Sequence, residues 1–265
     1  MEGFSLGPLT FHWSGILLAL GVAMGFFLTA WEARRRNVDV EIIGDLFWPL
    51  VFWGTLGARL WHILTPPLSS VELGLTTQYY FTHPLDMLSL WNGGYGIPGA
   101  LTAGLLVLWI YARRYRLPFW RLADLFAPGL ALVQSIGRLG NLFSQELYGQ
   151  PSNAPWSIFI QPAHRLIGYE TVATYHPLFA YEAALTITAL YCLFWISQRT
   201  TDRLKAGDLI LAYLAFYSLV RILLEFLRID VALVGGVNVN QVFFAVTLIG
   251  ACIALVTHHR SVGKL

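Results

Sequence analysis

The chain has little charge for its length. Asp, Glu, Lys and Arg make up 12% of its 265 residues, whereas hydrophobic residues make up 56%. An ordinary soluble domain carries about twice that share of charge. The composition therefore excludes such a domain and indicates a polytopic membrane protein. The formal net charge of +2 is also too small to favour nucleic acid as a partner.

Cysteine is equally scarce, with two residues in the whole chain. Cys192 and Cys252 both fall inside apolar segments, and no group of cysteines and histidines has the spacing of metal ligands. We interpret both cysteines as small core residues, and the sequence predicts neither a metal nor another cofactor. The first apolar stretch lacks a preceding basic residue and a following cleavage pattern, so we expect a retained helix and not a signal peptide.

Long apolar segments dominate what is present. Seven of them approach the roughly 20 residues that cross a bilayer as a helix: 12–31, 44–64, 95–112, 122–141, 177–197, 207–227 and 238–258. The sequence thus predicts an all-α polytopic membrane protein with about seven transmembrane helices, forming a single domain over residues 1–265. Two longer loops, 65–94 and 142–176, are rich in proline, glycine and aromatic residues, which is typical of interfacial structure.

The basic residues are distributed unevenly between the two sides of these spans. Lys and Arg near span ends are retained on the cytoplasmic face. Twelve of the 17 follow the first, third, fifth and seventh spans: Arg34, Arg35, Arg36, Arg113, Arg114, Arg116, Arg121, Arg199, Arg203, Lys205, Arg260 and Lys264. The pattern predicts an extracytoplasmic N-terminus, a cytoplasmic C-terminus and two extracytoplasmic long loops.

One polar segment interrupts the apolar pattern at the end of the fourth span. Residues 137–149 contain a cation, an amide and a carboxylate, Arg138, Asn141 and Glu146, together with glycines that include Gly149. Ionisable residues at membrane depth are costly and usually have a task. Arg138 and Asn141 share nearly one helix face and can both contact a phosphoryl or glycerol oxygen. Glu146 fits two roles, orienting an arginine or accepting a proton.

A second charged group lies in the sixth span. Arg221 and Glu225 are four residues apart, so they share one helix face with Tyr217, one turn earlier. Taken alone, such a pair can simply neutralise itself within the membrane. Arg138, however, is expected at the same outer level. Guanidinium stays protonated and binds phosphate oxygens bidentately, so the sequence predicts that Arg138 and Arg221 converge on one lipid phosphate.

Further polar segments reach the same outer level. Gly93 and Gly94 belong to a glycine-rich entry to the third span, where the positive end of the helix dipole favours an anion, although such an entry alone more often serves packing. The opening of the fifth span adds three polar residues: His176, Tyr181 and Glu182. Arg59, in the second span, is expected to pair with a carboxylate or a lipid headgroup.

These residues form a pattern that extends over most of the chain. Its parts are the segment 137–149, His12-Trp13, Gly57-Ala58-Arg59, Gly93-Gly94, Gly99, His176-Pro177, Tyr181-Glu182 and Arg221 with Glu225. In these parts the chain closely resembles the prolipoprotein diacylglyceryl transferases, bacterial inner-membrane enzymes that attach lipid to lipoproteins. An ordered motif of this length is far more specific than a single catalytic pair.

The resemblance implies a reaction and its partners. A multi-pass enzyme of the bacterial plasma membrane would transfer the diacylglyceryl group of phosphatidylglycerol to the lipobox cysteine thiol of preprolipoprotein signal peptides. Glycerol 1-phosphate would be the co-product, and the lipid bilayer would supply the donor. A thiol is mostly protonated near pH 7, so a base or a cationic environment must assist it.

The resemblance also implies roles for individual residues. The catalytic set would be Arg138, Arg221, Glu225 and Glu146. Arg138 would bind the phosphate, with the other substrate-binding residues around it: Asn141, Gly149, Gly93, Gly94, Tyr217, His176, Tyr181 and Glu182. The arginines would lower the pKa of the thiol and stabilise the departing phosphate.

The chain departs from the family pattern at two positions. Pro98 stands where many members have a histidine, and Ser14 stands where they have a tyrosine. Proline cannot act as a base, which leaves His12 and His176 as candidate substitutes. The alternative is a catalytically altered paralogue that serves as a phospholipid-binding membrane scaffold. A secondary transporter is less compatible with the chain, because such proteins often have inverted repeats and this sequence shows no internal repeat.

Overall fold

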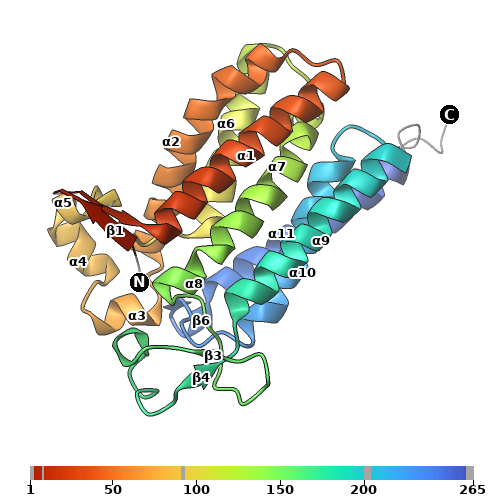
Figure 1. The fold of residues 1–265 in the computed structure, drawn as a ribbon. Coiled ribbons are helices and arrows are strands. Elements are labelled where there is room, and N and C mark those ends of the chain that lie inside the picture. The colour runs from red at the N-terminus through yellow and green to blue at the C-terminus, as the bar shows by residue number, and fades with distance from the viewer. Residues whose placement is uncertain (1–2, 8, 91–92, 200–203, 261–265) are drawn as a thin grey trace.

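The computed structural model describes residues 3–7, 9–90, 93–199 and 204–260, and it confirms the predicted all-α fold class (Figure 1). Seven helices in these ranges have 18 residues or more: α1 Trp13–Arg35, α2 Val40–Leu64, α6 Ile97–Arg114, α7 Phe119–Leu139, α9 Leu178–Arg199, α10 Asp208–Glu225 and α11 Val239–Arg260. Each overlaps one predicted span, and its ends lie within four residues of the expected ones.

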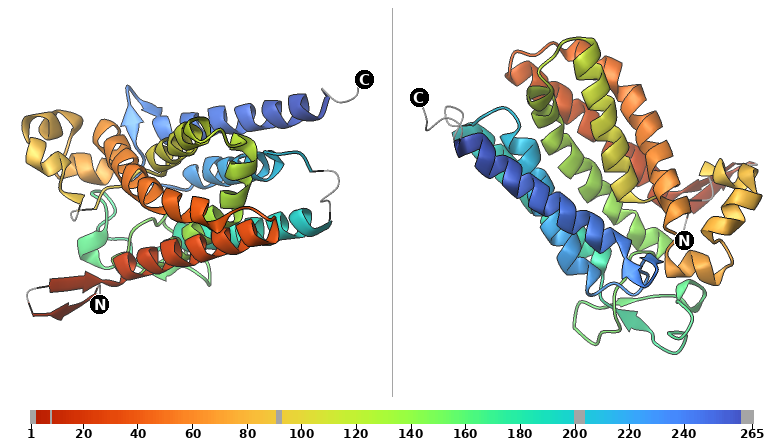
Figure 2. Two further views of the ribbon diagram at one scale, coloured as in Figure 1. Left: turned by 90° about the horizontal axis from the view of Figure 1, so that it is seen from above. Right: turned by 180° about the vertical axis from the view of Figure 1, so that it is seen from behind.

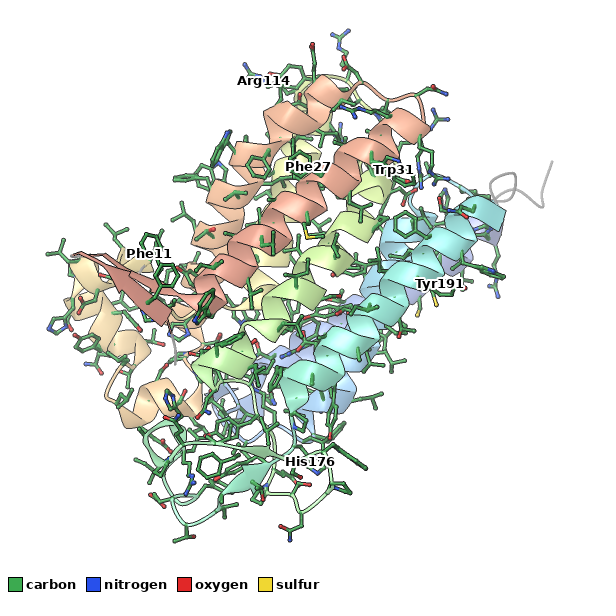
Figure 3. All side chains as sticks on the ribbon, viewed as in Figure 1. Phe11, Phe27, Trp31, Arg114, His176 and Tyr191 are labelled. Atoms are coloured by element: carbon green, nitrogen blue, oxygen red, sulfur yellow. The ribbon has the colours of Figure 1, made fainter. Side chains whose placement is uncertain are left out.

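The membrane character of the chain is visible in its helices. Four of them, α1, α2, α9 and α11, are long and apolar enough to cross a membrane by length and composition. Large apolar side chains face outward, such as Phe27, which is 68% exposed (Figure 3). Cys192 and Cys252 are also exposed, so their assignment to the core was wrong. An apolar helix in a membrane presents one face to lipid, and burial therefore does not follow from apolar surroundings.

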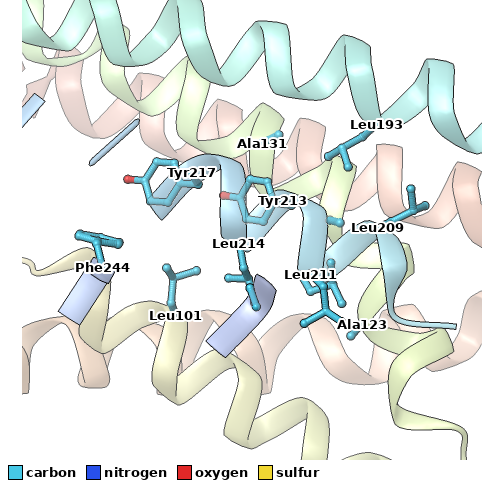
Figure 4. Packing of buried hydrophobic residues seen from close by; sticks show 13 residues of the cluster. Leu101, Ala123, Ala131, Leu193, Leu209, Leu211, Tyr213, Leu214, Tyr217 and Phe244 are labelled. Atoms are coloured by element: carbon cyan, nitrogen blue, oxygen red, sulfur yellow. The ribbon is translucent and has the colours of Figure 1, made fainter. Parts of the chain in front are cut away.

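Three of the long helices pack around α10. This helix contacts α7, α9 and α11, and 12 of its 18 residues are buried. Tyr213 and Tyr217 of α10 lie among apolar side chains of the neighbouring helices, including Leu101 and Phe244 (Figure 4). A second group is formed by α1 against α7 and by α2 against α6. Figure 2 shows α11 on the side of the bundle away from α1.

Helices α2 and α6 approach closely at paired glycines. A Cβ added to Gly57 would lie 2.6 Å from the backbone oxygen of Gly99, so no side chain fits between the two backbones. Small residues at such crossings are typical of helices that pack in membranes. The close contact holds the chain before α6 against the end of α2.

Shorter elements gather at one end of the bundle (Figure 1). They are the hairpin β1 Gly3–Leu6 with β2 Leu9–His12; α3 Leu68–Glu72, α4 Thr77–Thr82 and α5 Pro84–Met87; α8 Asn141–Ser144; β3 Ile158–Phe159 with β4 Thr174–Tyr175; the 3₁₀ turn Pro162–His164; and β5 Leu233–Val234 with β6 Val237–Asn238. Most belong to the two stretches that the sequence predicts as long loops. The hairpin β1–β2 was not predicted.

The described basic residues that follow the first, third, fifth and seventh spans lie at the opposite end. Arg114 and His176 mark the two ends of the bundle in Figure 3, and Arg34, Arg35 and Arg36 end or follow α1 at the Arg114 end. Arg203 and Lys264 lie outside the described residues. The uneven distribution in the sequence is thus also a separation in space.

Candidate active site

A cavity of about 540 Å³ lies at the end of the bundle that carries the short elements, and we call this the cavity end. Its walls come from α2, α4, the chain before α6, α7, α8, α10 and the segment after α10. Six residues predicted to form the site line it: Gly93, Gly94, Arg138, Asn141, Glu146 and Arg221.

Glu182 of α9 joins the two predicted arginines. Its side chain is completely buried, and its two oxygens bind different helices. Nε of Arg138 lies 2.9 Å from Oε1, and Nη1 of Arg221 lies 2.8 Å from Oε2. The hydroxyl of Tyr217 donates to Oε1 at 2.6 Å. A buried carboxylate is tolerated only when it is paired and hydrogen-bonded in this way, so Glu182 fixes both guanidinium groups in place.

The pairing continues along α10 and beyond it. Nη2 of Arg221 donates to Oε2 of Glu225 at 3.1 Å, and Nη1 of Arg228 lies 3.9 Å from the same oxygen. We call Arg138, Arg221, Arg228, Glu182 and Glu225 the arginine cluster. Within the cluster three guanidinium groups face two carboxylates, and Asp230 and Glu146 also line the cavity. All three arginines line the cavity, so their nitrogen donors face whatever enters.

Glu146 and Asn141 lie beside the cluster. The Nδ2 group of Asn141 donates to Oε2 of Glu146 at 3.4 Å. Glu146 is exposed, but the protein around its carboxyl desolvates it in part and raises its pKa, and the opposing effects of Ser144 and Arg138 are smaller. The neutral form of Glu146 is therefore favoured more than in a free glutamate.

The other predicted site residues lie behind or beside the cavity. In the part of the chain that the structure describes, the lining does not include Gly149, His176, Tyr181, Glu182, Tyr217 or Glu225. Gly149 packs against the segment after α10, where a Cβ would lie 2.8 Å from the oxygen of Leu227. Nδ1 of His176 lies 3.0 Å from the hydroxyl of Tyr181, at the outer edge of the molecule (Figure 3).

Arg59 lies on the α2 side of the cavity and is 4% exposed. Its guanidinium donates to the backbone oxygens of Asp86 and Gly93, each at 2.6 Å, and of Met87 at 3.2 Å. The acceptors among the described residues are thus carbonyl oxygens, and the predicted carboxylate partner was wrong. A loop far along the chain supplies these acceptors, so Arg59 fixes the glycine-rich entry to α6.

His62 is a cavity-lining residue that sequence reasoning missed. It is buried three residues after Arg59 on α2, and its Nε2 lies 3.5 Å from the hydroxyl of Tyr80. Gly94 stands directly against the ring with a φ of +76°, where a Cβ would lie 2.6 Å from Nε2. The spacing of three residues places His62 on the same helix face as Arg59. This spacing is the feature of the sequence that could have identified His62 as a site residue.

Comparison with known proteins identifies the same family over nearly the whole chain. The profile of the prolipoprotein diacylglyceryl transferase family matches residues 2–257. A phosphatidylglycerol–prolipoprotein diacylglyceryl transferase of Trichormus variabilis is 37% identical, over 94% of this chain and 85% of the relative. The enzyme of that name from Cutibacterium acnes is 36% identical, over 100% of this chain and 86% of the relative. The enzyme of that name from Synechococcus elongatus is 35% identical, over 95% of this chain and 84% of the relative.

Proposed function

Because the chain belongs to the prolipoprotein diacylglyceryl transferase family, we propose that it transfers the diacylglyceryl group of phosphatidylglycerol to a cysteine thiol of a preprolipoprotein signal peptide. The new bond joins the cysteine sulfur to the glycerol carbon that bears the phosphate ester. The bond from that carbon to oxygen breaks, and glycerol 1-phosphate leaves with the electron pair. The thiol gives up its proton.

The observation that carries this proposal is the convergence of Arg138, Arg221 and Arg228 on one cavity. The phosphodiester of phosphatidylglycerol carries one negative charge, which guanidinium groups can bind. Arginine suits this task because its planar fork binds two phosphate oxygens at once. Arg138 meets Glu182 through Nε, so this contact does not require its two terminal nitrogens.

The same arrangement favours the departure of the product. As the carbon–oxygen bond breaks, a second negative charge develops on the phosphate. Arg138 and Arg221 are already held by Glu182, so they stabilise this charge without first having to reorganise. Asn141, which lines the cavity, adds an amide donor for a phosphate or glycerol oxygen.

The size of the cavity supports a donor drawn from the bilayer. A volume of about 540 Å³ is in the range of small-molecule sites and is suited to a phospholipid headgroup. The two acyl chains are then left in the lipid that surrounds the apolar helices.

We further propose a location in the bacterial plasma membrane with the cavity on the extracytoplasmic side. The group of basic residues at the end opposite the cavity supports this orientation, because arginines at span ends are retained in the cytoplasm. The N-terminus then lies outside and the C-terminus inside. A signal peptide that crosses the membrane presents its cysteine at the level of the cavity.

Purified protein in vesicles of phosphatidylglycerol, supplied with a lipobox cysteine peptide, tests the proposal. We expect a thioether-linked diacylglyceryl group on the peptide, measured by mass spectrometry, and an equal amount of released glycerol phosphate. A peptide with serine in place of the cysteine, and the Arg138→Ala variant, are the controls. Binding of phosphatidylglycerol without product would contradict the transfer reaction and favour the scaffold.

A further inference from the structure

The transfer reaction needs a group that takes up the thiol proton. The pKa of an ordinary cysteine is about 8.5 and only the thiolate is nucleophilic, so most acceptor molecules are inactive at neutral pH. Pro98, at the first turn of α6, lines the cavity but has no group that exchanges a proton. Neither His12 nor His176, the candidates suggested by the sequence, belongs to the described lining.

We propose that His62 is the proton acceptor, an assignment that rests on the transfer reaction proposed above. It is the one histidine among the described residues that line the cavity. Imidazole suits the task because its ordinary pKa of about 6.5 leaves it neutral, and able to accept a proton, at neutral pH.

The surroundings of His62 leave its Nε2 atom open to a ligand. A side chain at position 94 would cover this nitrogen, since a Cβ there would lie 2.6 Å away. Gly94 adopts a φ of +76° that favours glycine, so the nitrogen stays uncovered. The hydroxyl of Tyr80, 3.5 Å from Nε2, is the nearest polar partner and is weakly placed to compete with a substrate.

His62 faces charges of both signs. Arg59 comes from its own helix, Tyr80 from α4 and Asp230 from the segment after α10. Arg59, Tyr80 and Asp230 share the lining of one cavity with the imidazole.

The location of His62 also fits the direction of attack. Displacement at a tetrahedral carbon requires the nucleophile to approach from the side opposite the leaving oxygen. The arginine cluster lies on α7, α9, α10 and the chain after α10, whereas His62 lies on α2, which packs on α1 and α6. The phosphate and the thiol can thus be held by different walls of one cavity.

The proton and electrons balance in this step. The S–H proton moves to Nε2 of His62, the sulfur electron pair forms the C–S bond, and the C–O electron pair leaves with the phosphate. The phosphate monoester leaves as the dianion, and the imidazolium then releases its proton to water. Glu146, the other acid–base candidate, lies next to Asn141 on the phosphate side.

The His62→Gln variant tests the role of His62 as proton acceptor when its rates with a cysteine peptide and with a selenocysteine peptide are compared. A selenocysteine peptide needs no base, because a selenol is far more acidic than a thiol and is largely ionised at neutral pH. We expect the variant to transfer to the thiol at least about 100-fold more slowly than the wild type, and to the selenol within about threefold of it. Equal losses with both acceptors would assign His62 to positioning and overturn the proposal, as would a normal rate with the thiol.

Two further variants isolate the effect. His83→Gln changes an exposed histidine at the end of α4 that does not line the described cavity, and it should match the wild type with both acceptors. Glu146→Gln should slow both acceptors alike, because it acts on the phosphate side. A loss confined to the thiol in Glu146→Gln would transfer the assignment to Glu146. If the wild type makes no thioether at all, the transfer reaction itself is contradicted.

The pH dependence of the wild type provides a second measurement should His62→Gln not fold. With a thiol acceptor and an imidazole base that is already neutral, kcat/KM should be level between about pH 7 and pH 8. A rate that keeps rising toward the thiol pKa of about 8.5 would show that no base assists and would contradict the role of His62.

Discussion

Two buried glutamates, one at each end of the bundle, bind arginines in different ways. Glu32 of α1 lies at the end opposite the cavity and Glu182 lies at the cavity end, and the side chains of both are 0% exposed. Glu32 pairs with Arg35 and Arg36, three and four residues further along its own helix, with N–O distances of 2.6 Å. These two arginines are about a third exposed, at 30% and 28%.

The arginines of Glu182 instead come from α7 and α10 and line a cavity. A pair close in sequence forms with the helix itself, complements the helix dipole and is screened by solvent. An assembly from three helices forms only when the whole bundle has folded, and it holds cations where a ligand can reach them. The same residue types thus stabilise a helix end at Glu32 and present charge at Glu182.

The largest expected effect follows from removing a cavity arginine. Arg138→Ala should lower the rate of diacylglyceryl transfer at least about 1,000-fold, or about 4 kcal/mol, because the phosphate loses its bidentate donor and Glu182 loses a partner. Arg138→Lys should restore little, since an ammonium cannot reproduce the fork. Arg35→Ala, at the other end, should stay within about threefold of the wild type. Initial rates of transfer measure these effects. A nearly normal rate in Arg138→Lys would contradict bidentate phosphate binding by Arg138.

A smaller loss is expected when the glutamates themselves are changed. Glu182→Gln keeps the shape but frees the two arginines from their common anion, and we expect a rate about 100-fold lower. The matched change Glu32→Gln should leave the rate within about threefold and lower stability by about 1 kcal/mol. Rates and thermal unfolding should be measured on both variants. Equal activity losses in Glu32→Gln and Glu182→Gln would contradict the different roles assigned to these two glutamates.

Gly94→Ala should act on the cavity without removing a charged group. The new Cβ would lie 2.6 Å from Nε2 of His62 and 2.8 Å from Nη1 of Arg59, at a φ of +76°. We expect a roughly tenfold loss of rate and a destabilisation of about 1–3 kcal/mol. Gly44→Ala is the control, because nothing lies within 4 Å of its added Cβ and alanine favours a helix. Unchanged activity in Gly94→Ala would show that this loop has room to move.

The smallest expected effect is a pH dependence confined to the cavity end. Partial desolvation raises the pKa of Glu146, so the group ionises at a higher pH than a free glutamate, and any stability from its neutral form is lost as pH rises through that pKa. Protonation removes a negative charge beside the phosphate. Affinity for phosphatidylglycerol should therefore rise about threefold between about pH 7 and pH 5. Equilibrium binding of phosphatidylglycerol at several pH values measures this effect. Glu146→Gln should abolish the pH dependence of the affinity; an unchanged pH dependence would show that another group causes it.

The sequence predicted the long helices well because apolar length is a local property. Every predicted span overlaps a helix of the structure, including α10, whose charged residues Arg221 and Glu225 interrupt an apolar run. The hairpin β1–β2 escaped prediction because it is too short and too close to the first span for periodicity to reveal it. Its strands pair from Gly3 with His12 to Leu6 with Leu9.

The site was predictable in part, for a physical reason. Arg138 and Arg221 carry charge in apolar segments at one expected level, and that suffices to place them together. Which polar residue faces the cavity depends on the rotation of each helix about its axis. Helix boundaries that are uncertain by a few residues do not fix this rotation. Glu182 was therefore predicted as a substrate-binding residue, whereas its side chain is fully buried beneath the arginines. The contact of His62 with Gly94 joins positions 32 residues apart and leaves no local signal.

An experimental structure with phosphatidylglycerol bound tests the central claim most directly. We expect one phosphate within hydrogen-bond distance, about 2.7–3.2 Å, of guanidinium nitrogens from both Arg138 and Arg221, with Glu182 still bridging the two side chains from behind. A phosphate bound away from this pair, or bound while the two arginines separate from Glu182, would contradict it.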